Sequence, residues 1–185
     1  MPILDAETSI YPNNLFSAAD VDPSDRRWIA SYTKSRQEKA LARHLVGMRI
    51  PFYLPLVRKN NLIRGRRVQS LIPLFGGYVF LFGNETERVK SLMTNRISKM
   101  IEVDDQRLLS HDLRQIERLI HSDAPLTVES QLGPGRRVRI KNGSMMGLEG
   151  TVVSRRGETR LLVAVSFLHQ GVSVEIDDFV LEPID

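Results

Sequence analysis

The side chains that could do chemistry in this chain are mostly cations. Residues 58–67 read Arg-Lys-Asn-Asn-Leu-Ile-Arg-Gly-Arg-Arg, which holds five basic residues and no acidic one. Asparagine and glycine favour a tight turn, so this run predicts an exposed basic hairpin tip. A basic surface of this kind commonly contacts nucleic acid, because neutralising phosphates releases their counterions. The alternative is a solvated hairpin whose charges only keep edge strands from aggregating.

A second group of cations lies on a predicted helix. The spacing of Leu41, Leu45 and Met48 predicts an amphipathic helix over residues 35–48. Ser35 and Glu38 have the spacing of a capping box at its start. The opposite face of this helix is basic and carries Arg36, Lys39 and Arg43.

Residues typical of catalytic and metal sites are sparse. The chain has no cysteine, and its four histidines are scattered without metal-ligand spacing beside a carboxylate. It has no phosphate-cradling glycine loop and no nucleophile elbow. The sequence therefore predicts a binding protein rather than an enzyme, with no metal and no cofactor.

Composition and charge limit the class of protein further. Of the 185 residues, 42% are hydrophobic, which is enough for a folded core. No apolar run approaches the roughly 20 residues of a membrane span, and residues 1–25 do not resemble a signal peptide. Residues 26–122 hold 19 basic and 8 acidic side chains. We expect a cytoplasmic protein whose basic body meets nucleic acid.

Hydrophobic patterning predicts two domains between an acidic N-terminal tail and the C-terminus. Residues 1–25 have no sustained period and are expected to be flexible. Residues 26–122 alternate strands with helices that begin near Ser35, Asn84 and Ser110, which is an α+β order. Residues 123–132 look like a linker. From 133 to 185 short strands with period 2 are separated by glycines, as in a small all-β barrel.

Three motifs in register resemble the NusG family. They are Trp28–Lys34 followed by Ser35–Glu38, the run Phe75-Gly-Gly-Tyr-Val-Phe80, and Gly135-Arg-Arg-Val-Arg-Ile140 with later glycines at 143, 147 and 150. This family comprises transcription elongation factors. The resemblance implies an N-terminal NusG domain, with an antiparallel sheet flanked by helices, and a C-terminal KOW domain, an SH3-like barrel. We expect that barrel to be constitutive, because its valines keep strand alternation.

The resemblance also implies where this chain binds its partners. Family members dock on the clamp helices of the RNA polymerase largest subunit, which suppresses pausing and promotes antitermination. The residues that match this surface are Tyr32, Phe75, Tyr78, Phe80 and Met100. The position of Phe75 before a glycine turn independently suggests that it lies near the surface. The implied contacts with non-template DNA or nascent RNA are Lys34, Arg36, Lys39, Arg43, Arg58, Lys59, Arg64, Arg66, Arg67, Thr94, Asn95 and Arg96.

Some departures from the family pattern suggest a specialised, RfaH-like paralogue. The usual Phe-Pro-Gly-Tyr is Phe75-Gly-Gly-Tyr78 here, which loosens the turn. The KOW partner-binding positions hold Phe167, Leu168 and His169, which puts binding of Rho or of a small-subunit ribosomal protein in doubt. An RNA-binding or ribosome-associated KOW protein is the alternative function, since the KOW region is itself basic.

Overall fold

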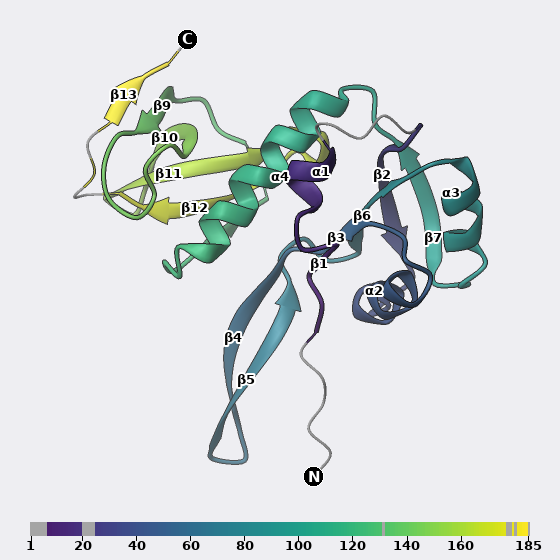
Figure 1. Ribbon diagram of the computed structural model, residues 1–185. Coiled ribbons are helices and arrows are strands. Elements are labelled where there is room, and N and C mark those ends of the chain that lie inside the picture. Colours follow the sequence, from purple (N-terminus) through teal and green to yellow (C-terminus); the bar gives the residue numbers. More distant parts are fainter. Residues whose placement is uncertain (1–6, 20–24, 131, 177–178, 180, 185) are drawn as a thin grey trace. The chain divides into compact units, whose positions relative to one another are not determined.

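The chain folds into two compact units, Met1–Gln106 and Arg107–Asp185 (Figure 1). The computed structural model describes residues 7–19, 25–130, 132–176, 179 and 181–184. All strand pairs in both units are antiparallel among the described residues. The first unit mixes helices with sheet, and the second contains a separate sheet, which confirms the coarse prediction of an α+β region followed by an all-β one.

A five-stranded sheet forms the centre of the N-terminal unit. Its strands, in spatial order, are β1 (Ile10–Tyr11), β3 (Phe52–Tyr53), β6 (Tyr78–Gly83), β2 (Arg27–Thr33) and β7 (Ile97–Glu102). Helix α2 (Glu38–Gly47) packs on one face, where Leu41 and Leu45 meet Ile29 and Leu81 in a buried cluster. Each such side chain contributes roughly 1.5–3 kcal/mol on burial.

Part of the expected flexible tail is folded. Strand β1 pairs with β3, and helix α1 (Leu15–Ala19) follows it. Leu15 is buried, and the ring of Phe16 lies 5.2 Å from that of Tyr53 in an edge-to-face contact. The prediction of an unstructured segment is therefore wrong for residues 10–19, because aromatic packing compensates for their weak local pattern. Residues 1–6 and 20–24 lie outside the described residues.

Two helix starts with the same sequence spacing fold differently. Helix α3 (Glu85–Leu92) has a capping box: the Glu87 N–H donates to Asn84 Oδ1 at 2.9 Å, and the Asn84 N–H donates to Glu87 Oε2 at 2.9 Å. The capping box predicted at Ser35 is wrong. Helix α2 begins only at Glu38, and its N-cap, Gln37, makes no side-chain cap bond.

Strands β4 (Leu56–Ile63) and β5 (Arg66–Pro73) form a two-stranded sheet of their own. Both strands continue through the basic run that was predicted as a hairpin tip, and they end at a turn formed by Arg64 and Gly65. Both turn residues have positive φ, 49° and 77°. Figure 1 shows this hairpin extending away from the five-stranded sheet of its unit.

The C-terminal unit combines most of helix α4 (Gln106–His121) with a six-stranded sheet. The helix begins four residues before the predicted cap at Ser110, and the side chain of its first residue, Gln106, donates from Nε2 to the Val103 carbonyl at 2.9 Å. The strands, in spatial order, are β13 (Leu181–Pro183), β9 (Arg136–Ile140), β10 (Glu149–Arg155), β11 (Glu158–Val165), β12 (Gln170–Glu175) and β8 (Thr127–Glu129).

Strand β8 lies inside the segment predicted as a linker, so that prediction is wrong for residues 127–129. It pairs with β12 and extends a buried polar network. Arg160 donates to Ser173 Oγ at 2.9 Å and to Thr127 Oγ1 at 3.1 Å, and Ser173 Oγ donates to Glu129 at 2.7 Å. A buried guanidinium is tolerated only with such partners, so β8 is a structural part of this sheet. None of the described helices is long and apolar enough to span a membrane.

Candidate binding surfaces

The glycine pair after Phe75 forms a tight turn that is fixed from two sides. The Tyr78 N–H donates to the Phe75 carbonyl at 3.2 Å, and Gly77 has φ 88°, which is the pattern of a type II turn. The Gly77 N–H donates to Glu38 Oε1 at 2.8 Å, and its carbonyl accepts from the Thr33 N–H at 2.7 Å. The Glu38 carboxylate that was expected to cap α2 therefore anchors this turn.

Beside the turn, two tyrosines form an aromatic pair on one face of the sheet. Tyr32 and Tyr78 are register partners on β2 and β6, and their ring centroids lie 5.2 Å apart, edge to face. Tyr32 is 43% exposed, whereas Tyr78 is half-buried. The Tyr32 ring also covers Gly77, since a Cβ built on Gly77 would lie 2.6 Å from Tyr32 Cε2. Backbone turn and aromatic pair thus form one contiguous surface.

The structure separates the other predicted members of this surface. Phe75 is only 2% exposed, so the expectation that it lies near the surface is wrong. Phe80 stacks on Tyr78 with centroids 6.5 Å apart, but it is fully buried. Met100 is the register partner of Ser31, which places it on the opposite face from Tyr32, and it packs against the α2 core. Only Tyr32 and Tyr78 are available together.

One neighbour of this pair was missed by sequence reasoning. Lys99 lies directly opposite Tyr32 on β7 and is exposed. Directly opposed residues share a face of the sheet, so its ammonium borders the aromatic pair. Only the strand register could have revealed it, because β2 and β7 are some 65 residues apart in the sequence.

A polar cluster brings together the ends of β2 and α3. Lys34 Nζ donates to Asn95 Oδ1 at 2.7 Å, and the Lys34 N–H donates to the Arg96 carbonyl at 2.9 Å. Arg96 also donates to Gln37. Thr94 lies next to these residues and bonds the Ser91 carbonyl. Two predicted nucleic-acid segments, 34–36 and 94–96, are therefore adjacent.

The remaining cations predicted to contact nucleic acid differ in exposure and in ion pairing. Arg43 on α2 forms an ion pair with Glu7, which lowers its value as a phosphate ligand, and Lys39 is half-buried. Arg36 is exposed. The five hairpin cations are exposed, and none forms an ion pair with a described residue; they are Arg58, Lys59, Arg64, Arg66 and Arg67.

In the C-terminal unit, the predicted KOW partner positions follow β11. Ser166–Leu168 form a 3-10 turn, Phe167 and Leu168 are half-buried, and His169 is exposed with φ 52°. The Ser166 N–H donates to Asp112 Oδ2 of α4 at 2.9 Å. Burial raises the pKa of the Asp112 carboxyl, against the opposing effects of this hydrogen bond and of the charges on His111 and Arg137. The start of the loop is therefore held by α4.

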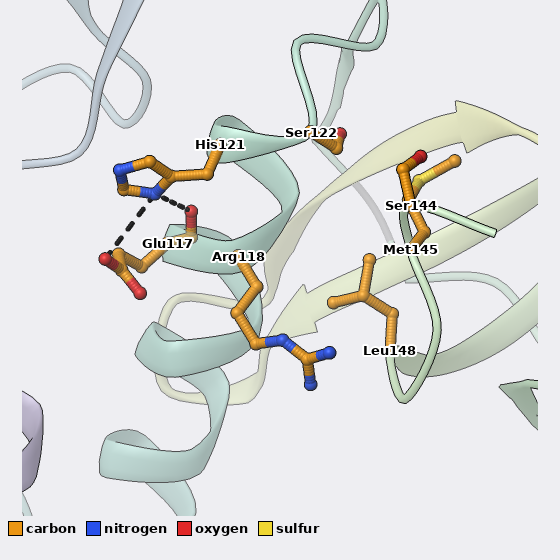
Figure 2. Close-up of a pocket in the computed structure, with 7 residues that line it drawn as sticks. All are labelled: Glu117, Arg118, His121, Ser122, Ser144, Met145 and Leu148. Carbon is orange, nitrogen blue, oxygen red and sulfur yellow. Dashed lines mark hydrogen bonds and ion pairs between the residues drawn. The ribbon is translucent and has the colours of Figure 1, made fainter.

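Helix α4 also borders a pocket of about 410 Å³ in the C-terminal unit (Figure 2). Its helix side carries Glu117, Arg118 and His121, and the facing loop supplies Met145 and Leu148. Arg118 donates to the Met146 carbonyl, and His121 Nδ1 lies 2.8 Å from the Glu117 carbonyl oxygen. These polar groups already have partners within the protein, so the pocket shows no preference for a particular ligand.

Comparison with known proteins identifies the family. A family model described as transcription termination factor nusG matches residues 26–129, more than half of the chain. The chain belongs to the NusG family. A search of curated proteins finds no match. Among solved structures, it resembles a chain from "Domain interaction in Thermotoga maritima NusG", at 18% identity and a TM-score of 0.44, covering 87% of this chain and 98% of that one.

NusG family proteins are transcription elongation and termination factors without enzymatic activity, and they generally bind RNA polymerase. The prediction of a transcription factor of this family is therefore confirmed at that level. The structural likeness to the Thermotoga chain is distant and places no individual residue.

Proposed function

We propose that this NusG protein binds the clamp helices of the RNA polymerase largest subunit, suppresses pausing and promotes antitermination. The observation that carries the proposal is the exposed Tyr32 ring, paired with Tyr78 and set on the turn at Gly77. Large aromatic side chains held rigidly at a surface are frequent anchors of protein interfaces. Phe75 and Phe80 are buried, and Met100 lies on the other face of the sheet, so the proposal does not use these three side chains as contacts with the partner. The cytoplasmic location predicted from the sequence belongs to this proposal.

Nucleic acid is the second partner in this proposal. The cluster of Lys34, Asn95 and Arg96 lies at one end of the sheet that carries Tyr32, since Lys34 follows β2 directly. Binding of polymerase through Tyr32 would bring these polar groups toward the DNA or nascent RNA of the same complex. The exposed hairpin cations add positive charge that phosphate would neutralise.

The alternative of an RNA-binding KOW protein has weaker support. Three of the basic side chains that suggested it are engaged within the sheet: Arg139 pairs with Glu149, Arg155 with Glu129, and Arg160 is buried. Specialisation as an RfaH-like paralogue remains part of the proposal. Binding of Rho or a ribosomal protein through Phe167, Leu168 and His169 would use a loop whose first residue is held by Asp112.

The test is direct binding of the full-length protein to a purified clamp-helix fragment of the polymerase. Tyr32→Ala should weaken binding by about 2 kcal/mol, or roughly thirtyfold, if Tyr32 is a central anchor. Met93→Ala is the matched control, because Met93 is 78% exposed but follows α3 and does not belong to the proposed surface. Wild-type affinity in a folded Tyr32→Ala protein would refute the proposed surface.

A further inference from the structure

The β4–β5 hairpin has the form of an isolated two-stranded ribbon. Each strand has eight residues, and within the part of the chain that the structure describes the two pair only with each other. At about 3.4 Å per residue, the ribbon is about 27 Å long. A turn with positive φ at both Arg64 and Gly65 closes it, which is the pattern of a type I′ turn. The ribbon is therefore a regular, extended element rather than an irregular loop.

The charge of the ribbon complements an anion. Residues 56–73 contain five basic residues and no acidic one. Elsewhere in the N-terminal unit, exposed arginines such as Arg27 and Arg43 have carboxylate partners, Glu102 and Glu7. Five cations without acidic neighbours repel one another and gain free energy from a polyanion.

Strand register sorts the ribbon's side chains onto two faces, because directly opposed residues point the same way. Arg58 lies opposite Leu71, Asn60 opposite Gln69, and Leu62 opposite Arg67. We call this set the reading face; its exposed polar members are Arg58, Asn60, Arg67 and Gln69. The other side, the back face, carries Lys59, Asn61, Ile63, Arg66, Val68 and Ser70.

The two faces differ in the burial and hydrogen bonding of their polar side chains. On the reading face, Gln69 Nε2 donates to Asn60 Oδ1 at 3.4 Å, a long bond between two exposed side chains. On the back face, Asn61 and Ser70 are half-buried, Asn61 donates to Ser70 Oγ at 3.3 Å, and Ser70 Oγ reaches the Lys59 carbonyl. The reading face therefore keeps more of its hydrogen-bonding capacity for a ligand.

The residue types of the reading face match base edges. Arginine forms bidentate hydrogen bonds with guanine, and asparagine or glutamine does so with adenine. Leu62, on the same face at the tip, is 73% exposed, and an aliphatic side chain there can contact a thymine methyl group. A surface that bound phosphate alone would need cations but no paired amides and no exposed leucine.

We propose that the β4–β5 ribbon enters the major groove of duplex DNA and reads base edges through Arg58, Asn60, Arg67 and Gln69. The major groove of B-form DNA is wide enough for a two-stranded ribbon, whereas the deep, narrow groove of A-form RNA is closed to side chains. The inference rests on the proposed function in one respect: the transcription complex is where the protein would encounter DNA.

The test uses full-length protein and a pool of short DNA duplexes with a randomised central segment. Wild-type protein should enrich particular sequences, and its affinity for an enriched duplex should exceed that for a scrambled duplex of the same composition. The double variant Asn60→Ala/Gln69→Ala should reduce this ratio by about five- to a hundredfold. The slope of affinity against salt should not change, because no charge is removed.

The matched control is Asn61→Ala/Ser70→Ala, which removes the hydrogen-bonded pair on the back face and should leave the ratio unchanged. Arg67→Lys gives a second, charge-conserving measurement: it should lower the ratio with no change in salt slope, since lysine cannot form the bidentate contact. Fluorescence of Trp28 reports folding of the N-terminal unit in each variant.

Three results would overturn the inference. They are equal affinity for all duplexes, tighter binding to duplex RNA or single strands than to duplex DNA, and an equal loss of preference in the back-face control. Binding to the clamp-helix fragment is measured in parallel. Equal affinity of the wild-type protein for all duplexes, with intact clamp binding, would sink this inference alone, whereas absent clamp binding with intact sequence preference would sink only the proposed function.

Discussion

Replacing Gly77 with alanine should disturb both the stability of the N-terminal unit and its aromatic surface. A Cβ at this position would lie 2.6 Å from Tyr32 Cε2, closer than carbon atoms tolerate, so the Tyr32 ring would have to rotate away. Gly77 also has φ 88°, a conformation that is unfavourable for alanine. The clash with the Tyr32 ring and the unfavourable φ both arise from the same added Cβ, so both act in this variant.

The expected loss of stability is about 1–2.5 kcal/mol. Placing alanine in the left-handed region costs about 1–2 kcal/mol, and breaking the Tyr32–Tyr78 contact costs a further 0.5–1.5 kcal/mol or so. Reduced entropy of the unfolded chain returns about 0.4–1 kcal/mol. Gly76→Ala is the control, because a Cβ there meets nothing within 4 Å and φ is not positive. It should be neutral or slightly stabilising.

Urea unfolding followed by Trp28 fluorescence measures this difference. Trp28 is the single tryptophan, is buried, and lies in the N-terminal unit, so it reports on the part that contains the turn. Gly77→Ala should also weaken clamp-helix binding, whereas Gly76→Ala should not. Equal stabilities for the two variants, within about 0.5 kcal/mol, would refute the reasoning, because both the conformational and the steric effect would then be absent.

Two further predictions concern the C-terminal unit. Burial raises the pKa of Asp112 above its usual value near 3.8, so its carboxyl favours folding most at low pH, and this contribution is lost as pH rises through the raised pKa. In Asp112→Asn this loss should vanish from pH-dependent denaturation curves, while hydrogen exchange should show the Ser166 amide still protected. An unchanged pH dependence in the variant would contradict the assignment. A fragment of residues 133–185 should give a circular dichroism spectrum without helix. It should unfold at a lower urea concentration than a fragment of residues 123–185, because it lacks Thr127 and Glu129, which are partners in the buried network. Equal unfolding midpoints for the two fragments would show that β8 adds no stability.

Sequence patterns predicted helices and strands well where the residues that bond to one another lie close together in the sequence. The period-2 pattern after residue 133 indicated the strands of the C-terminal sheet, and a helix does begin at Asn84, which forms a capping box with Glu87. Ser35 and Glu38 have the same spacing, yet Glu38 bonds the Gly77 N–H, 39 residues away. A distant backbone donor leaves no trace in the sequence around a helix start, so the two cases could not be distinguished beforehand.

The candidate surface could be predicted only in part for a related reason. Family resemblance pointed to five residues, but exposure depends on what packs over each one in three dimensions. Phe75 and Phe80 are buried, and Met100 lies on the other face of the sheet from Tyr32. Strand register decides which residues are neighbours, which is also why Lys99 was missed. Similarly, β8 has only three residues, too few to predict a strand from their composition, and it is pairing with β12 that makes them one.

The pairing of β8 has a consequence for how α4 meets the sheet of its own unit. Only residues 122–126 connect the end of α4 to β8. So short a tether holds the two at an effective concentration in the millimolar range. Hydrogen bonds from the Ser166 N–H to Asp112 and from the Glu149 N–H to Gln115 join α4 to the rest of its unit, and the apolar face of the helix is buried. An outside protein that binds the loop at 166–169 by displacing α4 competes with this tethered helix, so it needs a higher affinity than it would against the same contacts on a separate molecule.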